Sequence, residues 1–407
     1  PNGFRVMTNS SVKRVRSRLL LPPDKVYLDG NSLGPLTSEA SEHLFEVISQ
    51  QWGQDLVAGW NKHDWIELPR TVGDQIAPII GAHCGNVICC DSLSINLFKA
   101  LSAALEINNT RTRITVEAHQ FPTDNYIASG LARLMGPDRC QVNAIDISKL
   151  TADELSNTAV LALSHVDYKT GTLRDMPGIT ALAQEAGALV VWDLAHSAGV
   201  VDLSLEASKV DFAVGCTYKF LNGGPGAPGF LFARAEHQCA QNPIPGWMGH
   251  ARIFDFEPEY EPAKGIQRFL TGTQSVIALS AVAGALKLFE DVKVQDLRKA
   301  SLSLTRTFIE RWKRSPVHTA SALLTPENDS QRGSHVSLAL DDAFPISQAL
   351  IDDGIIIDYR EPNIVRFGFS PLYNTNADVE RAMSALEAIV ASKRYEAPKY
   401  QVKSTVT

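Results

Sequence analysis

Seven short apolar runs alternate with helix-like stretches between about residues 85 and 235, and this alternation limits the fold more than any other feature of the chain. Each run is short enough for a strand and nearly free of polar residues, which is typical of strands buried on both faces. Strands of this kind, separated by helices, form a mostly parallel sheet that helices cover on both sides. We therefore predict an α/β domain with the strands NVICC, RITVEA, CQVNAI, AVLALS, ALVVWD, VDFAVG and GFLFAR.

The flanks of this region predict a second, smaller unit. Residues 37–82 have largely helical patterns, with Thr37 or Ser38 as the N-cap of the first helix. Beyond about residue 296, a long helix, three strand-like runs and a last helix indicate a smaller α+β domain, and residues 243–272 read as loops. The expected parts are an N-terminal tail and segment that packs with the small domain (1–50), a large domain (51–295) and a small C-terminal domain (296–407).

The charge balance argues against one class of partner. The chain has 38 basic and 45 acidic side chains and a formal net charge of −7. Proteins that bind nucleic-acid duplexes usually carry an excess of Lys and Arg, so we expect no nucleic-acid partner. A local basic cluster near the N-terminus reads as a solvated, poorly ordered tail, and it comprises Lys13, Arg14, Arg16 and Arg18.

Apolar segments and cysteines indicate the compartment. No stretch approaches the ~20 apolar residues that span a bilayer, and the first residues lack the apolar core of a signal peptide. The six cysteines form no C-x-x-C pair, so neither a disulfide framework nor a metal site is expected. We predict a cytoplasmic protein that has no membrane partner and keeps its thiols reduced.

Two strand patterns end in residues that can carry chemistry. The run ALVVWD ends at Asp193, with His196 three residues later, and the run VDFAVG leads to Tyr218 and Lys219 before a glycine-rich turn. In open α/β sheets, ligands bind at the carboxyl ends of the strands. Pyridoxal phosphate (PLP) needs a lysine amine for a Schiff base and a carboxylate that faces its pyridine nitrogen. We therefore interpret Lys219 and Asp193 as residues that bind PLP.

Each of these residues also has a simpler explanation. Lys219 could be a surface lysine after a strand, and Asp193 could cap a helix, but the ordered set favours the cofactor. Lys169, in DYKTG, is a competing lysine because it also follows an apolar strand. It lacks an Asp-bearing strand immediately upstream, and YKTG is typical of a turn, so we prefer Lys219.

Two predicted helix starts could complete the site. In NVICCDSLSINLFKAL, a strand leads to Leu93 and Ser94 at the start of a helix, where free N–H groups favour a phosphate. The hydroxyl groups there could equally be ordinary N-caps. In RITVEAHQFPTDNYIASG, a second helix begins near Phe121 and Asp124, and an aromatic ring at a strand end can stack on a pyridine ring. A Phe before a Pro is also a common hydrophobic staple.

Taken together, these segments resemble the kynureninase family. The matching segments follow the family's order over about residues 26–395, and they are DGNSLG, DSLSINLFKAL, FPTD, WDLAHSAG, TYKFLNGGPG, GWMGH and VRFGFSPLYN. The resemblance implies the type I fold of PLP-dependent transferases, with a large PLP-binding domain and a smaller α+β domain. It also implies PLP as the cofactor and a homodimer with shared active sites.

The resemblance implies roles for the matching positions. Lys219 would form the Schiff base and abstract the α-proton, Asp193 would pair with the pyridine nitrogen, and Phe121 would stack on the ring. Further cofactor contacts are implied for Leu93, Ser94, Asp124, Ser164, His196, Tyr218, Trp247 and Thr273. Substrate contacts are implied for Asn31, His63, Thr271 and Arg366. Arg366 would hold the α-carboxylate, although it could also be a charged residue on a half-exposed strand, and His63 could be a packing histidine.

The implied reaction is hydrolysis of L-kynurenine to anthranilate and L-alanine by cleavage of the Cβ–Cγ bond. Tyr218 would donate a proton to the cleaved carbon or serve only as a phosphate ligand. Vertebrate-type members, which prefer 3-hydroxykynurenine, carry a Ser-Asn-Pro-Pro segment where this chain reads Thr271-Gly272-Thr273-Gln274. Without the Asn amide, a 3-hydroxyl group would lose a partner, so we expect plain kynurenine to be preferred.

Three other functions stay open from the sequence. A cysteine desulfurase would need a reactive cysteine near the C-terminal domain, but no cysteine follows Cys239. An aminotransferase would share the fold, and steady transfer of the amino group to a keto acid would reveal it. A non-catalytic binding protein of the same fold is disfavoured by the presence of Lys219, Asp193 and Arg366.

Overall fold

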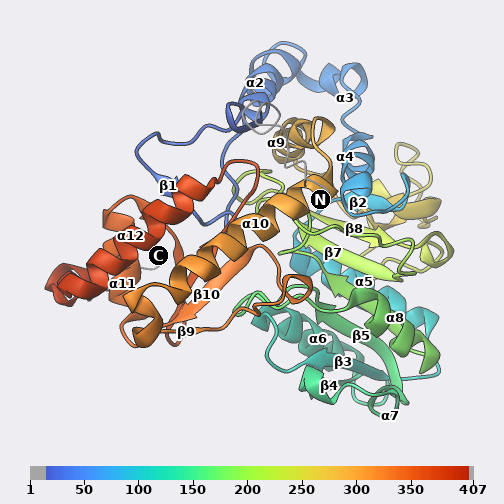
Figure 1. Ribbon diagram of the computed structural model, residues 1–407. Coiled ribbons are helices and arrows are strands. Elements are labelled where there is room, and N and C mark those ends of the chain that lie inside the picture. Colours follow the sequence, from blue (N-terminus) through green and yellow to red (C-terminus); the bar gives the residue numbers. More distant parts are fainter. Residues whose placement is uncertain (1–14, 403–407) are drawn as a thin grey trace, which may run out of the picture.

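A seven-stranded sheet forms the centre of the larger part of the molecule (Figure 1). The structure, a computed structural model, describes residues 15–402. The strand order is β2-β8-β7-β6-β5-β3-β4, in which β8 runs antiparallel to both neighbours and β3 to β7 are mutually parallel. The predicted mostly parallel sheet is confirmed, and its strands are β2 (Val87–Cys89), β3 (Arg113–Glu117), β4 (Gln141–Ile145), β5 (Thr158–Ser164), β6 (Leu189–Asp193), β7 (Phe212–Cys216) and β8 (Gly229–Ala233).

Helices cover both faces of this sheet, as predicted. In β6, Val190 and Trp192 pack into an apolar cluster with α4, α8 and α9, whereas Val191 packs into another with α5 and α6. Because successive side chains of a strand point to opposite faces, both faces of the sheet are buried and most of its strands carry few polar residues. The edge strand β4 is the exception, because only its last residue, Ile145, is buried, so its prediction as a buried strand is wrong. The helices of this part are α4 (Leu68–Ile76), α5 (Leu93–Ile107), α6 (Pro122–Met135), α7 (Ala152–Leu155), α8 (Met176–Glu185) and α9 (Val276–Leu286).

The smaller unit is a four-stranded antiparallel sheet with the strand order β12-β13-β10-β9. On one face, Val336 and Phe367 pack with Phe308 in an apolar cluster. The other face carries His335 and Arg366, because polar and apolar residues alternate along the strands. The elements are α10 (Val294–Lys313), β9 (Ala322–Leu323), β10 (His335–Ala339), α11 (Ala343–Asp352), β12 (Asp358–Arg360), β13 (Ile364–Gly368) and α12 (Asn376–Ser392). Of the helices described within residues 15–402, none is long and apolar enough to cross a membrane.

The N-terminal segment contacts both units. β1 (Val26–Tyr27) pairs in parallel with β11 (Ile355–Ile356) of the smaller unit, whereas α2 (Ser38–Glu46) packs on α9. Thr37, one of the two predicted N-caps, accepts a hydrogen bond from the backbone N of Ala40 at 3.0 Å. A π-helical turn (Val47–Trp52) and α3 (Gly59–Lys62) follow.

The predicted basic tail is only partly described. Lys13 and Arg14 lie outside the described residues. Arg18 contradicts the prediction, because its side chain is only 18% exposed and forms ion pairs with Glu39 and Asp291. The interpretation of Arg18 as part of a solvated tail is therefore wrong, since these carboxylates fix it against the body of the protein.

Candidate active site

Two neighbouring parallel strands bring the catalytic candidates to one edge of the sheet. Asp193 is the last residue of β6, and Lys219 lies three residues after the end of β7. Because the two strands run in the same direction, their carboxyl ends meet. His196 Nε2 lies 3.2 Å from Lys219 Nζ. Burial raises the pKa of Asp193, and the nearby Lys219 charge opposes that rise. The half-buried amine therefore lies close to a buried imidazole and a buried carboxyl group.

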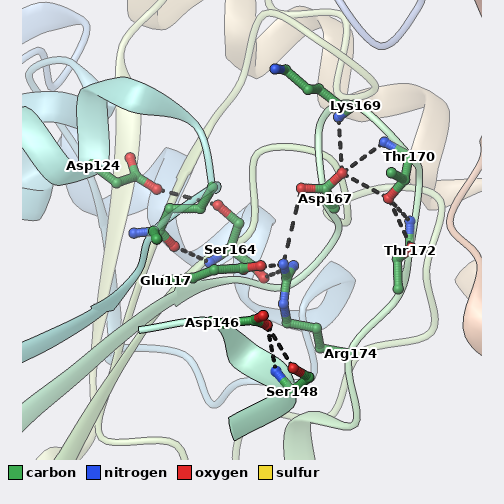
Figure 2. A network of polar contacts seen from close by, with 12 residues as sticks. Glu117, Asp124, Asp146, Ser148, Ser164, Asp167, Lys169, Thr170, Thr172 and Arg174 are labelled. Carbon is green, nitrogen blue, oxygen red and sulfur yellow. Dashed lines mark hydrogen bonds and ion pairs between the residues drawn. The ribbon is translucent and has the colours of Figure 1, made fainter. Parts of the chain in front are cut away.

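A second carboxyl group, Asp124 from the first turn of α6, lies beside Asp193. Ser164, at the end of β5, donates a hydrogen bond to Asp124 Oδ2 at 3.3 Å (Figure 2). The other Asp124 oxygen is buried and has no partner among the described residues. Burial, followed by the Asp193 charge, raises the pKa of Asp124 well above its usual range. A cation next to this acidic pair would be stabilised, which fits the protonated pyridine nitrogen of PLP.

The start of α5 has the features of an anion site. Ser92 caps the helix by accepting a backbone hydrogen bond at 3.3 Å, which places Leu93 and Ser94 in the first turn, where helices present N–H groups to anions. Asp91 has a left-handed φ of 47°. The buried Lys99 fixes that turn, because its Nζ lies 2.7 Å from Asp91 Oδ2.

Tyr168 contacts both Phe121 and Arg366. Phe121 directly precedes α6, is 42% exposed, and meets the Tyr168 ring edge-on with the ring centroids 5.3 Å apart. Its exposed surface is available to stack on a planar ring. The Tyr168 carbonyl oxygen accepts a hydrogen bond from Arg366 Nη1 at 2.5 Å. Phe121 and Arg366 are therefore positioned by one residue.

Arg366 is fully buried, and the protein satisfies most of its donors. Its Nε donates to Asp358 Oδ1 at 2.7 Å, and its Nη2 bonds the other Asp358 oxygen and contacts Ser32 Oγ at 3.3 Å. With the Tyr168 contact, one of its five N–H groups has no contact among the described residues. Arg360 also pairs with Asp358, at 2.9 Å. One open N–H and a second guanidinium group nearby suit a carboxylate ligand.

The DGNSLG segment packs on the loop that carries Lys219. Gly34 N donates a hydrogen bond to Tyr218 O at 2.7 Å. A Cβ at Gly34 would lie 2.3 Å from the Lys219 carbonyl oxygen, so only glycine fits. Asn31 is completely buried, and neither polar atom of its amide has a partner among the described residues. An unsatisfied buried amide of this kind is a feature of ligand sites.

Tyr218 precedes the candidate lysine and is half-buried. Burial, followed by the nearby Cys216 thiol, raises the pKa of Tyr218. The phenol therefore keeps its proton at neutral pH, as a proton donor must.

Two of the substrate candidates, His63 and Thr271, have other partners. His63 Nε2 lies 2.9 Å from Asp55 Oδ2, and its ring packs beside Trp65. The Thr271 hydroxyl donates to the Ile244 carbonyl oxygen at 2.8 Å. No contact described for residues 15–402 joins either side chain to the candidate lysine.

Two cofactor candidates, Trp247 and Thr273, lie on the long loops after β8. The Trp247 ring packs against Phe254 with centroids 6.0 Å apart. Thr273 precedes Gln274, whose side-chain oxygen accepts a hydrogen bond from Asp91 N at 3.3 Å, so this segment lies near the start of α5. Within the described part of the chain, no contact joins Trp247 or Thr273 to the candidate lysine.

The competing lysine, Lys169, lies in a turn (Figure 2). Asp167 Oδ1 accepts hydrogen bonds from the backbone N of Lys169 at 3.1 Å and of Thr170 at 2.7 Å, which is the hydrogen bonding of an Asx-turn. Lys169 Nζ lies 5.7 Å from the centroid of the Tyr168 ring. The predicted turn is confirmed.

Four residues beside Arg366 are absent from the predicted site, namely Asp29, His335, Asp358 and Arg360. Burial, followed by the Asp358 charge, raises the pKa of Asp29 to about 7. The sequence signal that could have found three of them is alternation. In HVSLAL, which begins at His335, and in IDYR, which contains Asp358 and Arg360, polar residues alternate with apolar or aromatic ones, so one face of each strand needs polar partners.

Comparison with known proteins identifies the family. A family model described as the kynureninase C-terminal domain matches residues 297–386. A kynureninase from Pseudomonas fluorescens is 43% identical over 404 residues, which are 98% of this chain and 97% of that protein. A kynureninase from Burkholderia pseudomallei (strain 1106a) is 42% identical over 399 residues, which are 97% of this chain and 96% of that protein.

Solved structures show the same fold at lower identity. The apo cysteine desulfurase from Thermococcus onnurineus NA1 has a TM-score of 0.79 at 19% identity, and the match covers 96% of this chain and 100% of that one. This likeness concerns the fold alone and confirms the predicted fold class. Because two kynureninases are 42% and 43% identical to it over nearly its whole length, the chain belongs to the kynureninase family.

Proposed function

We propose that this chain hydrolyses L-kynurenine to anthranilate and L-alanine with PLP as its cofactor. Family membership supports both the reaction and the cofactor, because kynureninases are PLP-dependent hydrolases of carbon–carbon bonds. One observation carries the assignment of the site: Lys219 Nζ lies 3.2 Å from His196 Nε2 beside the buried carboxyl groups. An amine and a carboxyl group in this arrangement match the needs of PLP.

The residues around Lys219 would hold the cofactor. Asp193 and Asp124 would face the pyridine nitrogen, and Phe121 would stack on the ring. The start of α5 would bind the phosphate. The other proposed contacts are Leu93, Ser94, Ser164, His196, Tyr218, Trp247 and Thr273. When bound, PLP supplies an electron sink that stabilises negative charge on the substrate's Cα.

The protein's own residues would move the protons. Lys219 takes the proton from Cα, and burial lowers the pKa of His196 so far that its neutral ring can accept a hydrogen bond from Nζ. Water adds to the Cγ carbonyl group and the Cβ–Cγ bond breaks, so the new carboxyl group of anthranilate keeps the oxygen atom of water. Tyr218 donates the proton that Cβ of alanine then requires, and Lys219 returns a proton to Cα, which completes L-alanine.

The substrate preference rests on the pocket. Arg366 would hold the α-carboxylate, with Asn31, His63 and Thr271 as further proposed contacts. The segment Thr271–Gln274 contains no Asn amide, and the Thr271 hydroxyl is already bonded to a backbone oxygen. A 3-hydroxyl group would therefore lack a partner, which supports a preference for kynurenine over 3-hydroxykynurenine. Equal kcat/KM values for the two substrates would contradict this preference.

A second copy of the chain is the proposed partner, in a homodimer with shared active sites. Five large apolar side chains within residues 45–57 are between 47% and 81% exposed, and we call them the apolar strip: Phe45, Ile48, Trp52, Leu56 and Val57. Exposed apolar groups gathered in one segment are typical of an interface. The six cysteines are all unpaired, which supports the proposed cytoplasmic location.

Purified protein reconstituted with PLP tests the cofactor and the reaction. We expect a visible absorbance band that borohydride bleaches, that Lys219→Ala lacks and that Lys169→Ala keeps. Addition of L-kynurenine to the wild type should release fluorescent anthranilate together with L-alanine. Amino transfer to a keto acid without anthranilate would identify an aminotransferase instead. A wild type without the band would contradict the cofactor assignment.

A further inference from the structure

His335, the first residue of β10, lies on the polar face of the smaller sheet. It pairs with Gly368 of β13, and Ser337 pairs with Arg366. Residues two apart in a strand share a face, so the side chains of His335 and Arg366 lie on the same side of the sheet. The intervening Val336 points the other way, into the apolar core.

The His335 ring is buried, and its hydrogen-bonding capacity is unused. Its exposed fraction is 0%, and neither Nδ1 nor Nε2 has a partner among the described residues. Burial, followed by the Arg366 charge, lowers the pKa of His335 to about 3, so the ring is neutral and offers one N–H donor and one acceptor nitrogen. Buried polar side chains are nearly always hydrogen-bonded. A ring with two unused nitrogens therefore indicates a partner that a ligand supplies.

The ring also lies near both groups that hold the substrate in the proposed function. Its centroid is 5.8 Å from the centroid of His196, whose Nε2 contacts Lys219 Nζ. Arg366 pairs with Ser337, two residues further along β10 on the same face, and its charge acts on the ring. An amino acid that has its nitrogen near Lys219 and its carboxylate at Arg366 would therefore pass alongside His335.

We propose that His335 is a substrate-binding residue that donates a ring N–H to the α-carboxylate held by Arg366. This inference rests on the proposed function, because it takes an α-amino acid as the ligand. After its contacts with Asp358, Tyr168 and Ser32, Arg366 has one open N–H. A carboxylate has two oxygens with about four acceptor sites, so it can accept donors beyond the open N–H of Arg366 and those of the nearby Arg360. His335 is a buried group on the same face with an unused donor.

Two substitutions separate hydrogen bonding from packing. His335→Phe keeps an aromatic ring of similar size but removes both nitrogens, whereas His335→Gln restores a donor. His83→Phe, at an exposed histidine before β2, is the matched control. Each holoenzyme is titrated with L-alanine, with the cofactor absorbance and calorimetry as readouts. The KM and kcat for L-kynurenine and the Tm are measured in parallel.

We expect His335→Phe to raise the dissociation constant of L-alanine and the KM of L-kynurenine by about tenfold, the scale of one lost hydrogen bond to a charged group. The kcat should change much less, and His335→Gln should recover part of the affinity. His83→Phe should match the wild type.

Unchanged L-alanine binding in a folded His335→Phe would overturn the proposal. The proposal would also be overturned if His335→Phe and His335→Gln lost L-alanine affinity to the same extent and both had a lower Tm, or if neither variant folded. Either result would show that the ring is needed for packing. A wild type that binds L-alanine but forms no anthranilate would refute the proposed function, and the titration would still decide the role of His335.

Discussion

Asp358 and Arg366, which pair directly across β12 and β13, form a bidentate ion pair, and both side chains are 1% exposed. Burial alone would raise the pKa of Asp358, but Arg366 and Arg360 outweigh it and lower the pKa to about 2. The carboxylate therefore stays charged inside the protein at neutral pH. Removal of one member of such a pair leaves the other charge buried without compensation.

Asp358→Asn should therefore destabilise the protein by ~3–5 kcal/mol, which is typical when one partner of a buried ion pair is removed. Urea unfolding of the holoenzyme measures the change. Asp353→Asn is the matched control, because its ion pair with Arg394 is partly exposed and should contribute at most ~1 kcal/mol. An equal loss in the free energy of unfolding for the two variants would show that the buried ion pair stabilises the fold no more than the exposed one.

Asp29 should give the fold a pH dependence of its own. Burial, followed by the Asp358 charge, raises the pKa of Asp29 from 3.8 to about 7, so the folded state binds this proton more tightly than the unfolded state does. The contribution of Asp29 is fully present below about pH 4 and is lost as the pH rises through about 7. Asp29→Asn cannot titrate and should flatten the fall in stability over that window. Urea unfolding of the wild type and of Asp29→Asn across this pH range measures the difference. If the stability of both proteins changed with pH in the same way, the predicted role of Asp29 would be wrong.

Local sequence patterns predicted the central sheet because all its strands except the edge strand β4 are buried on both faces. A strand such as β6 is a nearly unbroken apolar run that ends at a polar residue, and turns flank it on both sides. The helix α9 escaped prediction for the opposite reason. It packs against α2 and α4 and is apolar on nearly every side, so its sequence shows little helical periodicity.

The residues of the candidate site also differ in how well the sequence predicts their positions. Lys219 and Asp193 follow apolar strands, so their shared edge could be predicted from the order of elements. The environment of Arg366 could not, because it depends on the register between β10 and β13 and on the fit of the segment around Asp29 against them. Such long-range pairings leave no local signal beyond the alternation of polar and apolar residues. His335 is the clearest example, because a lone histidine at the start of a strand indicates nothing by itself.

Lys99→Met should weaken the proposed phosphate end of the site. The Lys99 ammonium group is fully buried and contacts Asp91 Oδ2 at 2.7 Å and the Phe269 carbonyl oxygen at 2.5 Å. Methionine has a similar volume but donates no hydrogen bond, so both acceptors lose their partner at a cost of ~1–3 kcal/mol. The turn before α5 would then be less well fixed. We expect a lower Tm and a higher dissociation constant for PLP in a fluorescence titration of the apoenzyme.

The control for Lys99→Met is Lys62→Met, since Lys62 also pairs with an aspartate, Asp55, but is exposed. It should leave both the Tm and the PLP affinity unchanged. If Lys99→Met lowers the Tm without changing the PLP affinity, the ion pair stabilises the fold and does not position the start of α5 for the cofactor.

The last prediction concerns the proposed dimer, whose interface we expect to include the apolar strip. Phe45 and Val57 are 74% and 81% exposed, and burial of one such side chain stabilises an interface by ~1.5–3 kcal/mol. The double substitution Phe45→Lys and Val57→Lys removes this gain from both subunits and adds charges to the interface. It should therefore raise the dissociation constant of a dimer by at least ~100-fold, since ~1.4 kcal/mol is a factor of ten. Sedimentation velocity over a dilution series measures it. Leu134→Lys alters an equally exposed apolar residue outside the strip and should sediment like the wild type.

If the active sites are shared between subunits, anthranilate formation per chain should fall as the double variant dissociates, whereas a fully active monomer would show that each site is complete within one chain.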